Sequence, residues 1–213
     1  MEMTDKEYVS RLIERAHKAQ AAADNFTQEY VDMLSRKIGW ALVQPETVDK
    51  IAEFCLEETR MGTFEAKQNK LYKKVRGVLR DINPLKSVGV IEEDKEKGLR
   101  RIAKPVGVIG SLIPTTQPEL CPATQAMLAV KARDAIIFSP HPRSQKTTLM
   151  VTDIVRKVLK DNGAPEDLVI CIEKPTMDKS TELMKQADLV IATGGAGMVK
   201  AAYSSGTPAY GVG

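Results

Sequence analysis

Three glycines stand within four positions near the end of the chain, in the stretch "DLVIATGGAGMVK". An apolar run precedes Gly194, Gly195 and Gly197, and a helix-like segment follows them. Glycines between a strand and a helix let backbone amides approach a phosphate, aided by the partial positive charge of the helix N-terminus. Because Lys200 replaces the third glycine of a GxGxxG pattern, the turn alone fits a phosphate site and a simple tight turn equally well.

Three other loops follow predicted strands, "PTTQPELCP", "SPHPRS" and "EKPTMD", at the carboxyl ends where open α/β sheets bind ligands. "PTTQP" places Thr115, Thr116 and Gln117 between two prolines, a rigid polar loop that could clamp a ligand, although such residues also serve as ordinary caps. "SPHPR" contains Ser139 and His141, which could hydrogen-bond ribose hydroxyls. The equal alternative for "SPHPR" is a capped turn with His141 exposed to solvent.

The cysteines and histidines favour neither a metal site nor a nucleophile. Cys55, Cys121 and Cys171 are odd in number and far apart, without CxxC spacing. His17 has one carboxylate a turn away, Glu14, which is too few ligands for a metal, so none is predicted. A thiol near a helix start can be reactive, but no base accompanies Cys121, so all three cysteines are predicted to be structural.

The bulk composition is that of an ordinary globular protein in a reducing compartment. The 213 residues are 43% hydrophobic and 28% charged, with a net charge of only +3. This spread of charge gives little support to nucleic-acid binding. No apolar run approaches the roughly 20 residues of a membrane helix, and the acidic N-terminus does not resemble a signal peptide, so the expected location is cytoplasmic, without membrane contact.

Apolar residues recur at helical spacing through residues 4–80. Thr27 is predicted to cap the start of a second helix. The buried face of that helix would consist of Val31, Leu34, Ile38 and Leu42. A third helix would follow Pro45 and end with Gly62 as its C-terminal cap.

The next helix contains "KQNKLYKKVRGVLR", whose Lys67, Lys70, Lys74 and Arg80 could form a cationic strip for phosphate or nucleic acid. Charge runs on amphipathic helices usually mark a solvated face, and that interpretation is favoured here, with Phe64, Leu71, Val75 and Leu79 on the opposite, buried side.

From residue 83 the pattern changes to extended structure, then to regular alternation. A hairpin is predicted to turn at residues 94–97. After it, the strands "PVGVIGSLI", "DAIIFSP", "DLVICIE" and "DLVIAT" are predicted to alternate with helices at residues 121–132, 145–161, 177–186 and 198–204. Nearly continuous apolar strands with helical crossovers predict an α/β fold in which N-terminal helices pack on an open, doubly wound, mainly parallel sheet. The predicted regions are helical 1–82, extended 83–104 and α/β 105–213.

Together the loops and strands suggest a family. The stretches "KPVGVIGSLIPTTQP", "ARDAIIFSPHPR" and "ADLVIATGGAGMVKAAYSSGTPAYGVG", with "EETRMG" at 57–62, resemble the CoA-acylating branch of the aldehyde dehydrogenase superfamily. The resemblance implies conversion of an aldehyde, CoA and NAD or NADP to an acyl-CoA and reduced cofactor. It is strongest toward enzymes of small aldehydes such as acetaldehyde, succinate semialdehyde or sulfoacetaldehyde. It also implies an oligomerisation arm in 83–104 and a homo-oligomer, a dimer or tetramer.

The resemblance assigns roles to particular residues. Pro114 and Thr115 would line the nicotinamide side, and Thr116 or Gln117 would donate to the oxyanion. Ser139 and His141 would contact the adenosine ribose. The diphosphate loop and helix would consist of Thr193, Gly194, Gly195 and Val199.

The family nucleophile is a cysteine in a catalytic domain that we expect to be absent from this chain. Val212 stands where hydrolytic relatives carry a glutamate base, which favours a thiol such as CoA as the acyl acceptor. We therefore expect the cofactor-binding part of an enzyme, inactive alone. The alternative is a naturally short, non-catalytic module that binds a dinucleotide or a partner.

Overall fold

The computed structural model describes residues 3–213, so the first two residues of the predicted helical region 1–82 lie outside it. Its centre is a five-stranded, entirely parallel sheet in the order β5-β4-β3-β6-β7. The strands are β3 (Val108–Ile113), β4 (Ala135–Pro140), β5 (Val169–Cys171), β6 (Leu189–Thr193) and β7 (Ala209–Val212). From β3 the chain first adds strands on one side and then on the other, so the predicted doubly wound α/β fold is confirmed.

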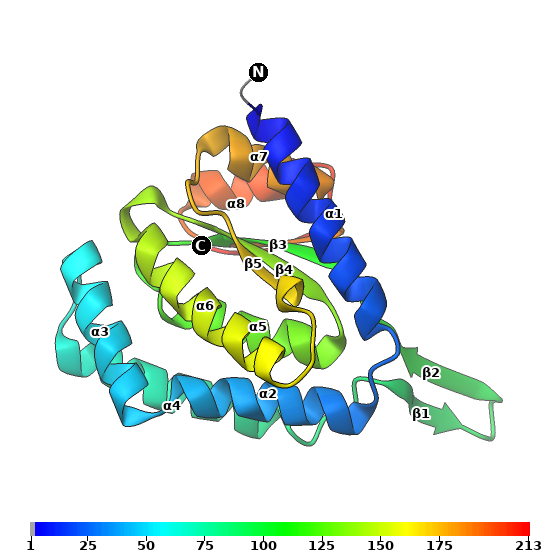
Figure 1. The fold of residues 1–213 in the computed structure, drawn as a ribbon. Coiled ribbons are helices and arrows are strands. Elements are labelled where there is room, and N and C mark those ends of the chain that lie inside the picture. The colour runs from blue at the N-terminus through cyan, green and yellow to red at the C-terminus, as the bar shows by residue number, and fades with distance from the viewer. Residues whose placement is uncertain (1–2) are drawn as a thin grey trace.

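Helices cover both faces of this sheet (Figure 1). On one face lie α5 (Leu120–Ala132) and α6 (Gln145–Asp161), and on the other lie α1 (Asp5–Ala23), α7 (Met177–Gln186) and α8 (Ala196–Tyr203). A further layer packs outside α5 and α6, formed by α2 (Gln28–Leu42), α3 (Pro45–Thr59) and α4 (Phe64–Ile82). One continuous hydrophobic core joins the N-terminal helices to the sheet.

The N-terminal helices begin and end largely where capping chemistry predicts. The Thr27 hydroxyl accepts a hydrogen bond from the backbone of Tyr30, which confirms it as the cap of α2. The prediction that Gly62 ends α3 is wrong. The helix stops at Thr59, and Arg60 takes the left-handed conformation with φ 53°, so the chain has already left the helix when it reaches Gly62.

The predicted buried faces are confirmed for α2, but α4 holds exceptions. Leu71 and Val75 are fully buried as predicted, and Leu79 is half-buried. The prediction that Phe64 is buried is wrong, because this first residue of α4 lies in the exposed segment that joins α3 to α4. Lys67, predicted to lie on a solvated face, is only 3% exposed because its ammonium group meets the carboxylate of Glu119. Lys74 and Arg80 are exposed, as the solvated-face interpretation predicts.

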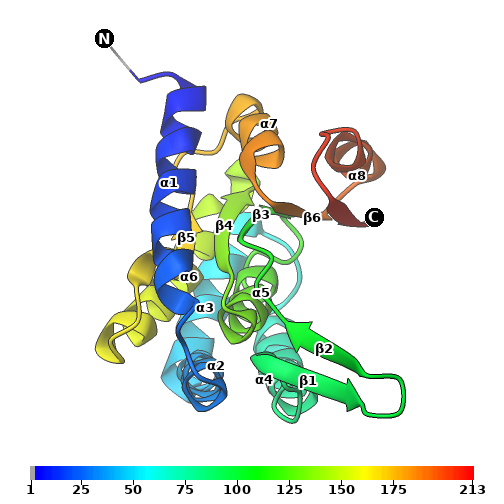
Figure 2. The same cartoon turned by 90° about the vertical axis from the view of Figure 1, so that its right-hand side faces the viewer.

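A two-stranded antiparallel hairpin stands apart from the main sheet (Figure 2). It consists of β1 (Gly89–Asp94) and β2 (Leu99–Ala103), and the Asp94 carboxylate accepts from the Lys97 backbone in the predicted turn. Exposed Val90 and Ile102 leave apolar surface on this arm.

Several predicted bounds in the α/β part of the chain differ from the observed ones, and one strand was not predicted. The first strand begins at Val108 rather than at residue 105. The third strand is shorter than "DLVICIE" because residues Glu166–Leu168 form a 3-10 turn before it. Helix α8 begins at Ala196 rather than Met198. Strand β7 was not predicted, since its alternation of exposed and half-buried residues is short and contains Gly211, where any side chain would collide with Val199 and Tyr203.

Two aspartates fix the chain at the entry to β3. Asp134 Oδ1 accepts from the backbone of Val106 at 2.6 Å and of Gly107 at 3.1 Å, and Asp188 Oδ2 accepts from Val108 at 2.7 Å. Burial raises the pKa of Asp134 to about 6, although the two backbone donors oppose the shift.

The substitution Asp134→Asn tests the free-energy cost of burying the ionised Asp134 carboxyl group. The folded-state pKa lies above the unfolded value, so the ionised carboxyl destabilises the fold above pH 6, and the penalty disappears as pH falls toward 4. Asparagine keeps the oxygen acceptor without the charge. We expect urea unfolding to show that the free energy of unfolding of Asp134→Asn, relative to that of the unaltered protein, increases as the pH rises from 4 to 7. Equal pH dependence in the two proteins would contradict the assignment.

Candidate functional site

A cavity of about 530 Å³ opens at the carboxyl ends of β3, β4 and β6. Because the chain reverses its direction of winding between β3 and β6, this is the switch point where open α/β sheets bind ligands. Four loops that follow strands contribute to it. The lining residues are Leu112, Ile113, Pro114, Thr115, Thr116, Ser139, Pro140, His141, Pro142, Pro175, Thr176, Met177, Ser180, Thr193, Gly194, Gly195 and Met198.

Most of the residues singled out from the sequence meet in this cavity. The structure brings together Pro114, Thr115, Thr116, Ser139, His141, Thr193, Gly194 and Gly195. Gln117 and Val199 do not line it. The Gln117 side chain lies 3.9 Å from the Cys121 sulfur, and Val199 packs toward Gly211 on the far side of α8.

A chain of hydroxyls determines what Ser139 can offer a ligand. Ser139 Oγ lies 2.9 Å from Ser180 Oγ, and Ser180 donates its proton to the carbonyl of Thr176, also at 2.9 Å. Since the Ser180 proton is engaged, Ser139 must be the donor between the two serines. Its remaining capacity is to accept, so a sugar hydroxyl would have to donate to it.

His141 has the opposite capacity. Its Nδ1 accepts from the backbone N–H of Arg143 at 3.1 Å, which caps a short 3-10 turn, and the ring is exposed. In the neutral ring the proton therefore sits on Nε2, which is free to donate. The two alternatives given for His141 are therefore compatible, since the residue caps an exposed turn and also lines the cavity.

The glycine turn leaves the start of α8 open. Gly195 is the N-cap and provides no side-chain capping bond, and a methyl group placed on it would meet no atom within 4 Å. The first N–H groups of a helix have no partner inside the helix, so they are free to bind an anion. Gly194 instead donates its N–H to the carbonyl of Val212, which ties the turn to β7.

The third loop, "EKPTMD", lies at this edge as predicted, and it supplies residues to which the sequence assigned no role. Pro175, Thr176, Met177 and Ser180 line the cavity around the start of α7. Thr176 caps α7 and also donates to Asp5 Oδ2 at 2.7 Å, so the first turn of α1 supports this side of the cavity. The capping threonine in "KPTMD" after an apolar run was the available signal.

The three thiols lack the surroundings of a nucleophile. All are buried, as predicted. Burial raises the pKa of Cys55 and of Cys121 to about 11, with a further contribution from the Glu119 carboxylate. Burial also raises the pKa of Cys171 to about 12. Reactive thiols have lowered pKa values, so these groups remain protonated at neutral pH.

Residues 3–213 contain no cluster of three or more histidine, cysteine, aspartate or glutamate side chains able to hold a metal ion. None of the helices in that part of the chain combines the length and apolarity needed to cross a membrane.

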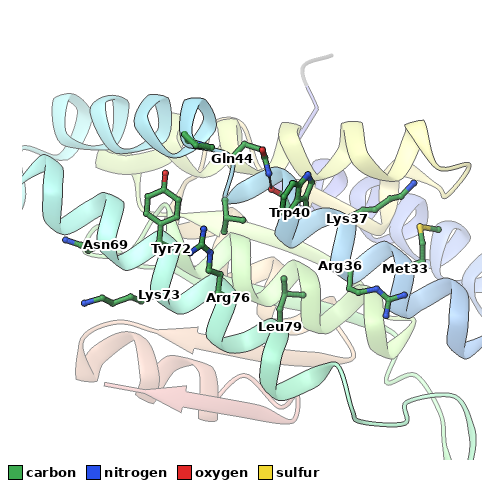
Figure 3. Close-up of a pocket in the computed structure, with 12 residues that line it drawn as sticks. Met33, Arg36, Lys37, Trp40, Gln44, Asn69, Tyr72, Lys73, Arg76 and Leu79 are labelled. Carbon is green, nitrogen blue, oxygen red and sulfur yellow. Dashed lines mark hydrogen bonds between the residues drawn. The ribbon is translucent and has the colours of Figure 1, made fainter.

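A second, wider groove of about 1030 Å³ lies between α2 and α4 on the outer helical layer (Figure 3). Exposed Trp40 and the Tyr72 ring lie on it, and the Arg76 guanidinium stacks 5.0 Å from the centre of that ring. The four basic residues of the predicted cationic strip do not line this groove. Two of them, Lys67 and Lys70, instead form ion pairs with Glu119.

Comparison with known proteins places the chain in a family. The profile described as "Aldehyde dehydrogenase family" matches residues 1–209. A sulfoacetaldehyde dehydrogenase of Acholeplasma sp is 48% identical over 94% of this chain and 42% of its own length. An acetylating succinate-semialdehyde dehydrogenase of Clostridium kluyveri is 41% identical over 99% of this chain and 46% of its own length. The chain thus spans less than half the length of these curated relatives.

Solved structures agree with this grouping. An acetylating aldehyde dehydrogenase from Geobacillus thermoglucosidasius superposes with a TM-score of 0.94 at 40% identity, over 98% of this chain and 46% of that one. An engineered glycolyl-CoA reductase with bound NADP+ gives 0.83 at 27% identity, over 96% and 47%. The chain belongs to the aldehyde dehydrogenase family, and within that family it resembles the acylating members.

Proposed function

We propose that the chain is the cofactor-binding portion of an NAD(P)-dependent, CoA-acylating aldehyde dehydrogenase, which converts an aldehyde, CoA and NAD(P)+ to acyl-CoA and NAD(P)H. The observation that carries the proposal is the uncapped start of α8, which opens with its glycines onto the cavity at the switch point of the sheet. The NADP+ bound by a similarly folded reductase supports a nicotinamide dinucleotide as the ligand.

The cavity residues suit the parts of such a dinucleotide. The N–H groups at the start of α8, with Thr193, Gly194 and Gly195, would hold the diphosphate. Ser139 as acceptor and His141 as donor would hold two hydroxyls of the adenosine ribose.

The loop after β3 would serve the reacting end. Pro114 and Thr115 would lie along the nicotinamide ring, which accepts hydride when bound. Thr116 or Gln117 would donate to the developing oxyanion. Thr116 is exposed at the cavity, whereas Gln117 would have to turn away from Cys121 to do so.

The nucleophile would come from outside residues 1–213. Acyl transfer in this family's chemistry needs a thiolate, and all three thiols of the chain are buried and protonated at neutral pH. Val212, at the end of β7, provides no base to activate water, which favours CoA as the acyl acceptor.

The remaining assignments follow the relatives. Their names support a small aldehyde substrate bearing a sulfonate or carboxylate. The projecting hairpin of residues 89–103, with its exposed apolar side chains, would be the arm that joins subunits into a dimer or tetramer. The working location of such an enzyme would be the cytoplasm.

Gly195→Ala separates ligand binding from folding. A methyl group here has open space in the unliganded protein but would stand where a diphosphate must approach. We expect titration of NADH and NADPH fluorescence to show at least about tenfold weaker binding, with little change in the urea midpoint. Gly77→Ala in α4 is the matched control, since its methyl group is also unobstructed and the residue lies away from the cavity. Binding by Gly195→Ala as tight as that of the unaltered chain would count against the diphosphate site.

The chain alone should be catalytically inactive. With acetaldehyde, succinate semialdehyde or sulfoacetaldehyde, CoA and either NAD+ or NADP+, we expect no formation of reduced cofactor, measured by absorbance, because no thiolate faces the cavity. Turnover by the purified chain that disappears in Cys121→Ala would overturn the assignment of the nucleophile.

A further inference from the structure

Two of the four cavity loops are held from behind by the outer helices. The carboxylate of Glu58, in the last turn of α3, accepts from the backbone N–H groups of Lys146 and Thr147, both at 2.8 Å, and from the Thr147 hydroxyl at 2.6 Å. These donors belong to the first turn of α6, which follows the end of β4, where Ser139 lies, and the short turn that His141 caps. Glu58 thereby caps α6 from another helix, at the end where a negative charge is favourable.

A buried ionic cluster holds the other loop. Glu119, the residue before α5, is fully buried, and its Oε1 lies 3.2 Å from Lys67 Nζ and 3.4 Å from Lys70 Nζ. Neither contact has the alignment of a hydrogen bond, so the attraction is chiefly between charges. Lys70 Nζ also lies 3.5 Å from the carbonyl of Thr116, a residue of the cavity. Glu119 therefore connects α4 to the loop that would carry the nicotinamide contacts.

The two loops are also bonded to each other. The Thr148 hydroxyl, fully buried in α6, donates to the carbonyl of Pro118 at 3.3 Å, and the backbone of His141 donates to the carbonyl of Ile113. A displacement at the start of either helix would therefore reach both walls of the cavity.

We propose that Glu58 and Lys67 are positioning residues for the dinucleotide, although neither lines the cavity. Glu58 sets the loop of Ser139 and His141 through α6, and Lys67 sets the loop of Thr115 and Thr116 through Glu119. Glu58 and Lys67 lie on either side of the short turn between α3 and α4. The same part of the outer layer therefore holds both walls of the cavity in position. This inference rests on the proposed dinucleotide function.

Glu58→Gln tests the first connection. Glutamine retains one oxygen acceptor and loses the charge, so the start of α6 loses part of its cap without a cavity being created. We expect the dissociation constant for NADH or NADPH to rise about fivefold, as for the loss of one net hydrogen bond. The emission spectrum of the saturated complex should also change, because the ring environment shifts. Glu57→Gln, at the exposed neighbouring position, is the matched control and should leave both readouts unchanged.

The second connection needs a variant that folds. Lys67→Met alone leaves Glu119 buried with a poorer partner and is expected to destabilise the protein. The double variant Lys67→Met with Glu119→Gln removes both charges and keeps the side-chain volumes. We expect it to fold, to bind the dinucleotide about fivefold more weakly, and to alter the bound emission spectrum. Lys74→Met on the exposed face of α4 is the control.

The outcomes separate the two proposals. If the unaltered chain gives no fluorescence change with NADH or NADPH, the proposed function fails. If the unaltered chain binds, while Glu58→Gln and the folded double variant match it in both affinity and emission, the dinucleotide function stands and the positioning role is overturned. Thermal unfolding of each variant, followed by circular dichroism, sets the temperature at which all are folded and compared.

Discussion

The buried carboxylate of Glu119 imposes the strongest constraint on this structure. A charge removed entirely from water must find an opposite charge, and Lys67 from α4 provides it. Breaking such a buried pair typically costs about 3–5 kcal/mol. The outer helices are therefore attached to the start of α5 by electrostatics as well as by the continuous apolar core, and the sheet, its inner helices and the outer layer form one packed body.

The direction of winding explains why polar loops gather at one edge. Parallel strands end at the same side of the sheet, and the reversal between β3 and β6 separates the helices that follow them. The resulting cavity receives acceptor, donor and backbone N–H groups from different loops. For two of these residues a second contact fixes the hydrogen-bonding capacity that is left for a ligand: Ser180 does so for Ser139, and the Arg143 backbone does so for His141.

Local patterns in the sequence predicted most of the fold, because apolar periodicity and capping residues act over a few positions. They placed α6 and α7 at their observed bounds and the hairpin at its turn. Lys67 was misplaced because periodicity treats lysine as solvated and cannot reveal a carboxylate on a distant loop. Strand β7 was not predicted because it is an edge strand that depends on the packing of Gly211 against Val199 and Tyr203.

The cavity residues were predicted as far as loop position allows. Residues such as Thr116 and Gly195 follow strand ends directly, and the sheet delivers them together. The sequence could not predict the side-chain direction of Val199, which points toward β7, or that of Gln117, which lies against Cys121. The contribution of Ser180 depends on the turn of α7 that carries it, one helical turn beyond the loop.

The bond between Thr176 and Asp5 has a practical consequence for handling the protein. It joins the opening turn of α1 to a wall of the cavity, and Lys179 reinforces the link by lying over the Tyr8 ring. Since Thr176 also lines the cavity, shortening the chain past the first turn of α1 would remove one support of that wall, so a protein used for ligand titrations should keep α1 whole.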